Sequence, residues 1–237
     1  MFDPSTISPI SVYDMGGLTF PGAPSLVYKI GELLSSGGFS FPNLEAEARI
    51  RVLDSMLPRC RLCHLSATHV PIPPRVAQNQ KLLVVGRNPN KGDASTRKLF
   101  DSPTQVCRLF RKYLDILQAS YQETSILNCC NCYLNGSVAP QPSEIFRCRE
   151  WLYLYLSAIS IPSTVLLLGN DAIRAFLGDN FPAITSCIGS LIQASVRGVK
   201  TLIVPIYHPG QVLRQPELWQ DVKAVLSEAQ KLRSLCC

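Results

Sequence analysis

Leu82-Leu83-Val84-Val85-Gly86 is an uninterrupted apolar run that ends in glycine, and helical periodicity follows it over residues 106–117. A short run without polar alternation is typical of a strand that is buried on both faces of a parallel sheet. The same order of strand, loop and helix recurs from residues 125–127 and 164–168, and a last apolar run spans 201–205. The sequence therefore predicts a three-layer α/β/α fold around a central, mostly parallel four-stranded sheet.

Polar side chains follow these predicted strands where each strand ends. Asn88 comes shortly after the first strand, Asn128 directly after the second, and His208 shortly after the last. In open α/β sheets, ligands bind beyond the carboxyl ends of the strands. We therefore expect these three residues to share one site.

Length and composition favour a single catalytic domain, residues 56–237, behind an N-terminal extension, residues 1–55, whose first part is rich in Pro, Gly and Ser. A formal net charge of +6 suits a polyanionic partner such as DNA, although the charge alone is weak evidence. No apolar run approaches the roughly 18 residues of a membrane span, and no secretory signal pattern is present. We expect a cytoplasmic monomer with no membrane partner and no obligate protein partner.

Four of the ten cysteines form a pattern that suits a metal centre. Cys60 and Cys63 enclose two residues before the first strand, and fifteen residues separate Cys132 from Cys148. A C-x-x-C pair lets both sulfurs face one point. A disulfide framework is not expected in a reducing compartment, so the spacing leaves zinc, an iron–sulfur cluster or simple core filling open. Four other cysteines lie in apolar segments and are interpreted as core residues: Cys107, Cys129, Cys130 and Cys187.

The cysteine spacing resembles that of the family 4 uracil-DNA glycosylases. The likeness runs from about Leu57 to Leu232 and passes through five segments in order: Gly86-Arg-Asn-Pro-Asn, Asn128-Cys-Cys-Asn-Cys132, Pro142-Ser-Glu-Ile-Phe-Arg-Cys148, Leu167-Leu-Gly-Asn-Asp-Ala172 and Tyr207-His-Pro-Gly-Gln-Val-Leu-Arg214. This resemblance implies a four-iron, four-sulfur cluster on the four patterned cysteines. It also implies a monofunctional DNA glycosylase that removes uracil from DNA in base-excision repair and leaves an abasic site.

The first motif departs from that family. Family 4 enzymes usually carry a carboxylate directly after the glycine, whereas Arg87 stands there and Asn88 follows. Asparagine at the later position resembles the mismatch-specific and single-strand-selective branches of the superfamily. An amide is no strong base, but its carbonyl can orient a water molecule, which suffices if the sugar develops oxocarbenium character first. A plain turn residue is the alternative for Asn88.

His208 matches the second motif of the superfamily, which implies that it stabilises the negative charge on the departing base. The segment after it contains Gly210, Leu213 and Arg214. In relatives this loop contacts DNA and inserts an apolar wedge while the target base is flipped outward. For Leu213, packing inside the loop is the alternative.

The base pocket predicted from the resemblance contains Gly86 and Arg87 with three further residues. Phe100, fourteen residues after Gly86, stands where the family has an aromatic ring that stacks on the base. The Asn128 amide is expected to select uracil, and a reversed amide would suit cytosine. Asp93 aligns with an acidic loop residue near C5 of the base. A core role for Phe100 and a capping role for Asn128 are the alternatives.

Two other functions are compatible with the sequence. Arg87 and Asp93 could admit a modified cytosine, as in an enzyme that attacks modified phage DNA. A non-catalytic DNA-binding relative is the other alternative, but the presence of both Asn88 and His208 argues against it.

Overall fold

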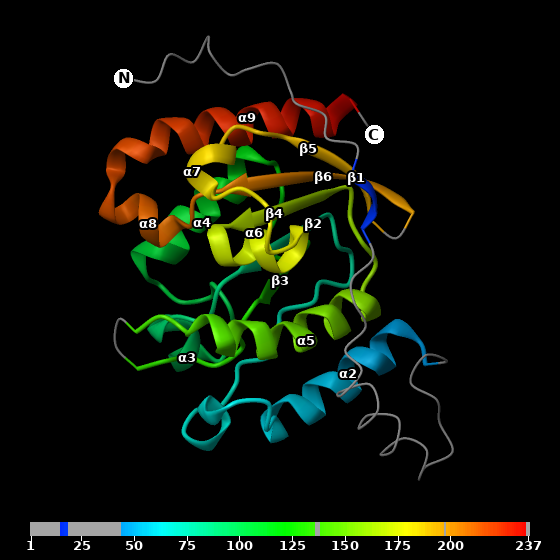
Figure 1. The fold of residues 1–237 in the computed structure, drawn as a ribbon. Helices are drawn as coiled ribbons and strands as arrows, with labels where there is room; N and C mark the ends of the chain where they lie inside the picture. The colour runs from blue at the N-terminus through cyan, green and yellow to red at the C-terminus, as the bar shows by residue number, and fades with distance from the viewer. Residues whose placement is uncertain (1–14, 19–43, 136–137, 197, 236–237) are drawn as a thin grey trace.

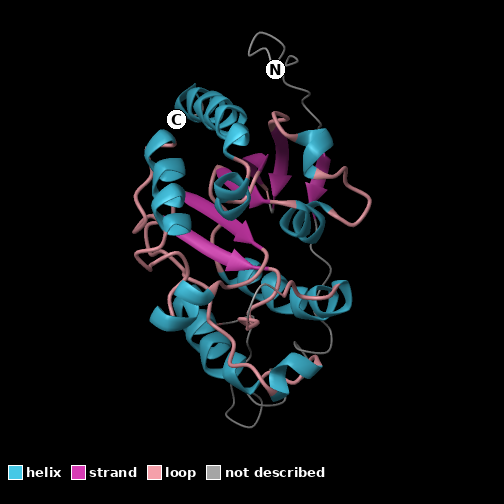
Figure 2. Ribbon diagram, turned by 90° about the vertical axis from the view of Figure 1, so that its left-hand side faces the viewer, coloured by secondary structure: helices cyan, strands magenta, loops and turns pink. Residues whose placement is uncertain are grey.

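The computed structural model describes residues 15–18, 44–135, 138–196 and 198–235. They form three layers, with one sheet between two layers of helices (Figure 1). In the view turned by 90°, helices lie on both sides of the strands (Figure 2). The described strands run in the order β1-β5-β6-β4-β2-β3. Their bounds are β1 Met15–Leu18, β2 Leu82–Gly86, β3 Thr124–Asn128, β4 Thr164–Leu168, β5 Ile192–Val196 and β6 Val199–Ile206.

The four predicted strands are confirmed as β2, β3, β4 and β6. They lie side by side and parallel, and β2, β3 and β4 are buried along their whole length. Gly86 at the end of β2 pairs in register with Asn128 at the end of β3. The parallel pairing therefore brings the carboxyl ends of these strands to one edge, where a ligand site is expected.

The sheet has six strands rather than the four that the sequence predicts. The added strand β5 pairs antiparallel with β6, and β1 pairs with β5. Buried and more exposed residues alternate along β5, because this strand is covered less fully than the central ones. A search for continuous apolar runs misses such a strand. The β1 sequence Met-Gly-Gly-Leu has little strand propensity of its own, so only its pairing identifies it.

Two helix pairs cover the sheet. The described helices are α2 Ala46–Met56, α3 Lys91–Thr96, α4 Gln105–Ile116, α5 Pro142–Ala158, α6 Asn170–Leu177, α7 Ile184–Cys187, α8 Pro209–Arg214 and α9 Trp219–Leu235, with short 3₁₀ turns η3 Leu57–Arg59, η4 His64–Ala67 and η5 Pro216–Leu218. Helix α4, which confirms the predicted periodicity, packs with α9, and α5 packs with α6. These pairs lie on opposite sides of the sheet (Figures 1 and 2).

Most of the predicted extension, residues 1–55, lies outside the described residues. Its described parts are β1 and most of α2. Helix α2 crosses the predicted boundary between residues 55 and 56, packs on α5, and buries Leu53 completely. In the part of the chain that the structure describes, no helix is both long and apolar enough to cross a membrane.

Candidate active site

A cavity of about 510 Å³ opens at the carboxyl edge of the sheet. It is bordered by the loops after β2 and β4 and by the segment that leads from β6 into α8. Of the residues predicted for the site, seven line this cavity: Arg87, Asn88, Asp93, Phe100, His208, Gly210 and Arg214. Three others, Gly86, Asn128 and Leu213, are not part of its wall.

Gly86 and Asn128 lie side by side behind this wall. A Cβ atom on Gly86 would stand 2.6 Å from Asn128 Oδ1, so only glycine leaves room for the amide in this position. The Asn128 side chain is 3% exposed. The amide therefore lies almost out of contact with solvent, directly behind Gly86.

The amide of Asn88 is oriented by its neighbours. Its Nδ2 donates to the Pro89 carbonyl at 3.0 Å, and its Oδ1 accepts from Arg87 Nε at 3.1 Å. The same Arg87 Nε lies 3.9 Å from Asp171 Oδ2, so this arginine is held between the loops after β2 and β4. An amide oxygen has two lone pairs, and one is left for a water molecule or a substrate group.

His208 caps the N-terminus of α8 with its side chain. Its Nδ1 accepts from the Gly210 N–H at 2.9 Å, which places the proton of the neutral ring on Nε2. Burial, together with the positive charges of Arg87 and Arg214, lowers the pKa of His208 to about 4. The ring is therefore neutral near pH 7 and has one N–H donor left.

Phe100 belongs to the wall of the same cavity. Its ring centroid lies 4.2 Å from that of Phe110 and 5.8 Å from that of His208. The backbone of Phe100 has a φ angle of +53°, a region that bulky L-residues rarely adopt. The ring is thus both a core residue, 3% exposed, and part of the cavity wall.

Asp93 is buried beneath the loop after β2. Its Oδ2 accepts from the Asn90 N–H at 2.8 Å in the capping box that begins α3, and its Oδ1 accepts from the Phe100 N–H at 2.6 Å. Burial raises the pKa of Asp93 to about 6, although both hydrogen bonds favour the charged form. Its carboxylate oxygens are turned to the backbone rather than displayed to a ligand.

Two exposed apolar side chains flank the cavity. Leu213, 38% exposed, belongs to α8, whose residues Gly210, Gln211 and Arg214 line the wall. Val138, 60% exposed, lines the wall itself and comes from the loop between β3 and α5. Sequence reasoning predicted the first and missed the second.

The predicted metal ligands gather on the α5 side of the sheet. His64 Nε2 lies 2.9 Å from Glu144 Oε1 and Arg147 Nη1 donates to the Leu62 carbonyl at 3.2 Å, so the C-x-x-C segment is tied to the helix that contains Cys148. The neighbouring Cys130 thiol and burial raise the pKa of Cys132, and the nearby Cys60 and Cys63 raise it as well. Across the described residues, no three His, Cys, Asp or Glu side chains are placed as ligands of a single metal ion.

N–H groups face two of these sulfurs. Trp151 Nε1 donates to Cys60 Sγ at 3.3 Å, and the Asn131 N–H donates to Cys148 Sγ at 3.4 Å. Cys130, predicted to be only a core residue, also lies close enough to Cys132 and Cys148 for their thiols to lower its pKa. The spacing of the four patterned cysteines does not indicate this contact.

Sequence reasoning also missed cavity residues from the loop after β4. Asn170 and Asp171 line the wall, and Asn170 Oδ1 accepts from the Ile184 N–H at 2.6 Å. Asp171 pairs with Arg87, as described above. Both residues follow a buried strand, so the rule that selected Asn88, Asn128 and His208 would have found them as well.

Comparison with known proteins agrees with this arrangement. The family model of the uracil DNA glycosylase superfamily matches residues 73–230. The type-4 uracil-DNA glycosylase of Archaeoglobus fulgidus is 26% identical over 181 residues, which cover 75% of this chain and 88% of the relative. The type-4 uracil-DNA glycosylase of Sulfurisphaera tokodaii is 25% identical over 124 residues, which cover 51% of this chain and 54% of the relative. Because the family model spans β2 to β6, the cavity loops and α8 together, this chain belongs to the uracil DNA glycosylase superfamily.

Proposed function

We propose that this protein is a DNA glycosylase that hydrolyses the N-glycosidic bond of uracil in DNA and leaves an abasic site. The observation that carries the proposal is the joint placement of Asn88, Phe100 and His208 in one cavity at the carboxyl edge of the sheet. The two relatives above carry the name of this activity. The arrangement supplies a donor for the leaving base, an oriented amide for water and a ring for stacking.

His208 acts on the leaving group. As the glycosidic bond breaks, negative charge grows on the base and is largest at its carbonyl oxygens. The Nε2–H of a neutral, fixed imidazole donates to such an oxygen without first giving up a proton. The hydrogen bond from Gly210 to Nδ1 holds this tautomer and prevents a ring rotation that would remove the donor.

Asn88 positions the attacking water. Its Oδ1 accepts a hydrogen bond from the water, while the bonds to Arg87 and Pro89 keep the amide from turning. Hydrolysis by way of an oxocarbenium-like sugar needs little help in removing a proton from water. Orientation is thus the contribution that we assign to this residue.

The base is held by stacking and selected by hydrogen bonds. Phe100 stacks on any base and therefore does not choose among them. The Asn128 oxygen accepts from uracil N3–H and its nitrogen donates to O4. The position of Asn128 supports this role, because it ends β3 beside Gly86 at the carboxyl edge of the sheet, next to the cavity loop after β2.

Residues at the rim of the cavity bind the DNA around the target base. Arg214 neutralises a backbone phosphate beside the target, and Leu213 enters the space that the flipped base leaves. Arg87 is exposed at the cavity and adds a second positive charge to the rim.

We propose further that Cys60, Cys63, Cys132 and Cys148 hold a four-iron, four-sulfur cluster. The donor set supports it: N–H groups aimed at Cys60 and Cys148 stabilise thiolates, as around iron–sulfur centres. A cluster is also larger than one metal ion, so its ligands stand further apart than those of zinc. When bound, it supplies a structural crosslink and no redox step, since hydrolysis transfers no electrons.

Purification without oxygen tests the cluster. We expect a brown protein with about four irons per chain, as the proposed cluster requires. The Cys148→Ser variant should lose this colour, whereas Cys187→Ser, which replaces another buried cysteine, should keep it. A colourless protein with one zinc per chain would contradict the assignment.

Oligonucleotides with one altered base test the function. Single- and double-stranded substrates with uracil, cytosine or a 5-substituted cytosine are incubated with enzyme and then with hot alkali, which breaks the strand at abasic sites. We expect cleavage at uracil. Cleavage only at the substituted cytosine would mean that this base, and not uracil, is the substrate. DNA that is bound but not cut would indicate a non-catalytic relative.

Variants assign the chemistry to the cavity. We expect Asn88→Ala and His208→Ala to lower the single-turnover rate while DNA affinity stays near that of the parent, because both residues act mainly in the transition state. Loss of one preorganised donor typically costs on the order of 100- to 1,000-fold. Asn79→Ala, at an exposed turn before β2, is the matched control. Near-parental rates in both active-site variants would place the active site elsewhere.

A cytoplasmic location, a monomeric state and the absence of an obligate protein partner stay predictions from the sequence. Gel filtration with light scattering tests the monomer.

A further inference from the structure

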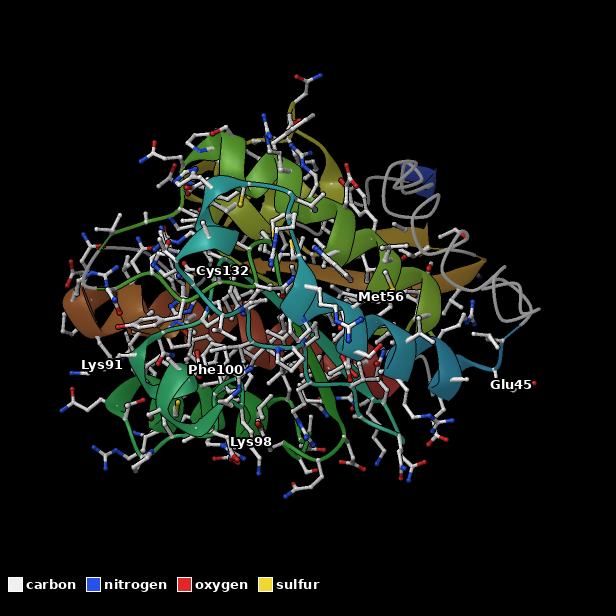
Figure 3. All side chains as sticks on the ribbon, turned by 90° about the horizontal axis from the view of Figure 1, so that it is seen from below. Glu45, Met56, Lys91, Lys98, Phe100 and Cys132 are labelled. Atoms are coloured by element: carbon white, nitrogen blue, oxygen red, sulfur yellow. The ribbon has the colours of Figure 1, made fainter. Side chains whose placement is uncertain are left out.

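Phe100 sits on a short loop whose backbone is held in an unfavourable conformation. Its φ angle of +53°, and that of +54° at Arg97, lie in the left-handed region. A non-glycine residue stays there only if its surroundings fix it. In the view from below, Phe100 lies nearer the centre of the molecule than the exposed Lys98 of the same loop (Figure 3). The loop therefore needs anchors to keep the ring in the cavity wall.

Three side chains from separate segments anchor this loop. Asp93 Oδ1 accepts from the Phe100 N–H at 2.6 Å, and Tyr121 Oη donates to the Leu99 carbonyl at 2.7 Å. Arg111 Nη2 lies 3.2 Å from Asp101 Oδ1. The anchors thus hold the residue before Phe100, Phe100 itself and the residue after it.

Tyr121 is itself fixed from both faces. Its ring lies between the guanidinium groups of Arg75, at 4.2 Å, and Arg111, at 3.8 Å. Arg75 forms a backbone bridge with Ile126 of β3, so this stack is tied to the sheet. Burial raises the pKa of Tyr121 to about 12, which keeps its hydroxyl protonated and able to donate at neutral pH.

We infer that Tyr121 is a positioning residue: its hydroxyl bond to Leu99 holds the Phe100 ring beside His208 for stacking on the target base. The inference rests on the proposed function only in that the stacked group is a DNA base. The contact between Tyr121 and the Phe100 loop does not depend on that function. Tyr121 is not among the residues that line the candidate active-site cavity. Its effect therefore reaches the reaction only through Phe100.

A double-mutant cycle separates this role from general stability. Tyr121→Phe removes the hydroxyl and keeps the ring between the two arginines. Tyr153→Phe, which removes another tyrosine hydroxyl bonded to a carbonyl, that of Ala175, is the matched control. Tyr121→Phe, Tyr153→Phe and Phe100→Ala are measured alone, and Tyr121→Phe is also measured together with Phe100→Ala. The quantities compared are apparent KM, kcat and melting temperature.

Stacking grips the base before and during bond breaking, so its loss should raise KM more than it lowers kcat. We expect Tyr121→Phe to raise KM about two- to tenfold, which is the range for one lost hydrogen bond. The same substitution should have no further effect in the Phe100→Ala background. Tyr153→Phe should leave KM unchanged. Equal effects of Tyr121→Phe with and without Phe100 would overturn the inference.

A second readout does not depend on activity. In protein with ¹³C-labelled phenylalanine, the Phe100 ring signal is identified by its loss in Phe100→Ala, and its shift reports stacking on Phe110. We expect Tyr121→Phe to move or broaden this signal and Tyr153→Phe to leave it in place. If the parent protein fails to cut uracil DNA but the signal moves, the proposed function fails and the anchoring stands. An unmoved signal overturns the anchoring.

Discussion

Because His208 is neutral near pH 7, its lowered pKa predicts how the excision rate depends on pH. With a pKa of about 4, only about one ring in ten is protonated at pH 5, whereas an ordinary histidine with a pKa near 6.5 would be almost fully protonated there. Protonation would require Nδ1 to stop accepting from the Gly210 N–H. We therefore expect the single-turnover rate at saturating enzyme to stay nearly constant from pH 7 to pH 5 and to fall only near pH 4.

The assay is excision of uracil from a labelled oligonucleotide, with enzyme in excess so that the chemical step is observed. His208→Gln is the matched variant, since glutamine keeps an N–H donor and does not titrate. Its rate should be lower, and the fall near pH 4 should be absent. Asp93 titrates near pH 6 and anchors Phe100, so binding rather than the saturated rate should weaken below pH 6. A parental rate that falls with an apparent pKa near 6.5 would refute a neutral, buried His208.

The pKa of His208 is lowered in the folded state. The free energy of unfolding of the parent, compared with that of His208→Gln, should therefore fall by up to about 3 kcal/mol from pH 7 to pH 4. The pKa of Asp93 is raised, so the free energy of unfolding of the parent, compared with that of Asp93→Asn, should rise by a similar amount over the same range; urea unfolding measures both. Gly86→Ala should displace the Asn128 amide and reduce discrimination between uracil and cytosine while the protein stays folded, which competition between the two substrates checks; unchanged discrimination would separate Asn128 from base choice. Arg214→Ala should weaken DNA binding and lower the slope of log K against log salt concentration by about one, as fluorescence anisotropy would measure; an unchanged slope would mean that Arg214 contacts no phosphate.

The sequence by itself determined the central part of the fold. Continuous apolar runs such as Leu82–Gly86 are predictable because a strand covered on both faces has no polar side. Their shared carboxyl edge then placed Asn88 and His208 in one site without any knowledge of side-chain positions. The paired cysteines and the ordered motifs pointed to the superfamily, which the family model confirms.

Only the tertiary structure decided which polar groups are free to act. Asp93 looks like a site residue in sequence, but the N–H groups of Asn90 and Phe100 occupy both of its carboxylate oxygens. The tautomer of His208 follows from one bond to Gly210. Tyr121 gave no signal, because its role depends on a loop more than twenty residues away in the chain. Such partners are set by packing between distant segments, whereas the period of apolar residues records only whether a local face is buried.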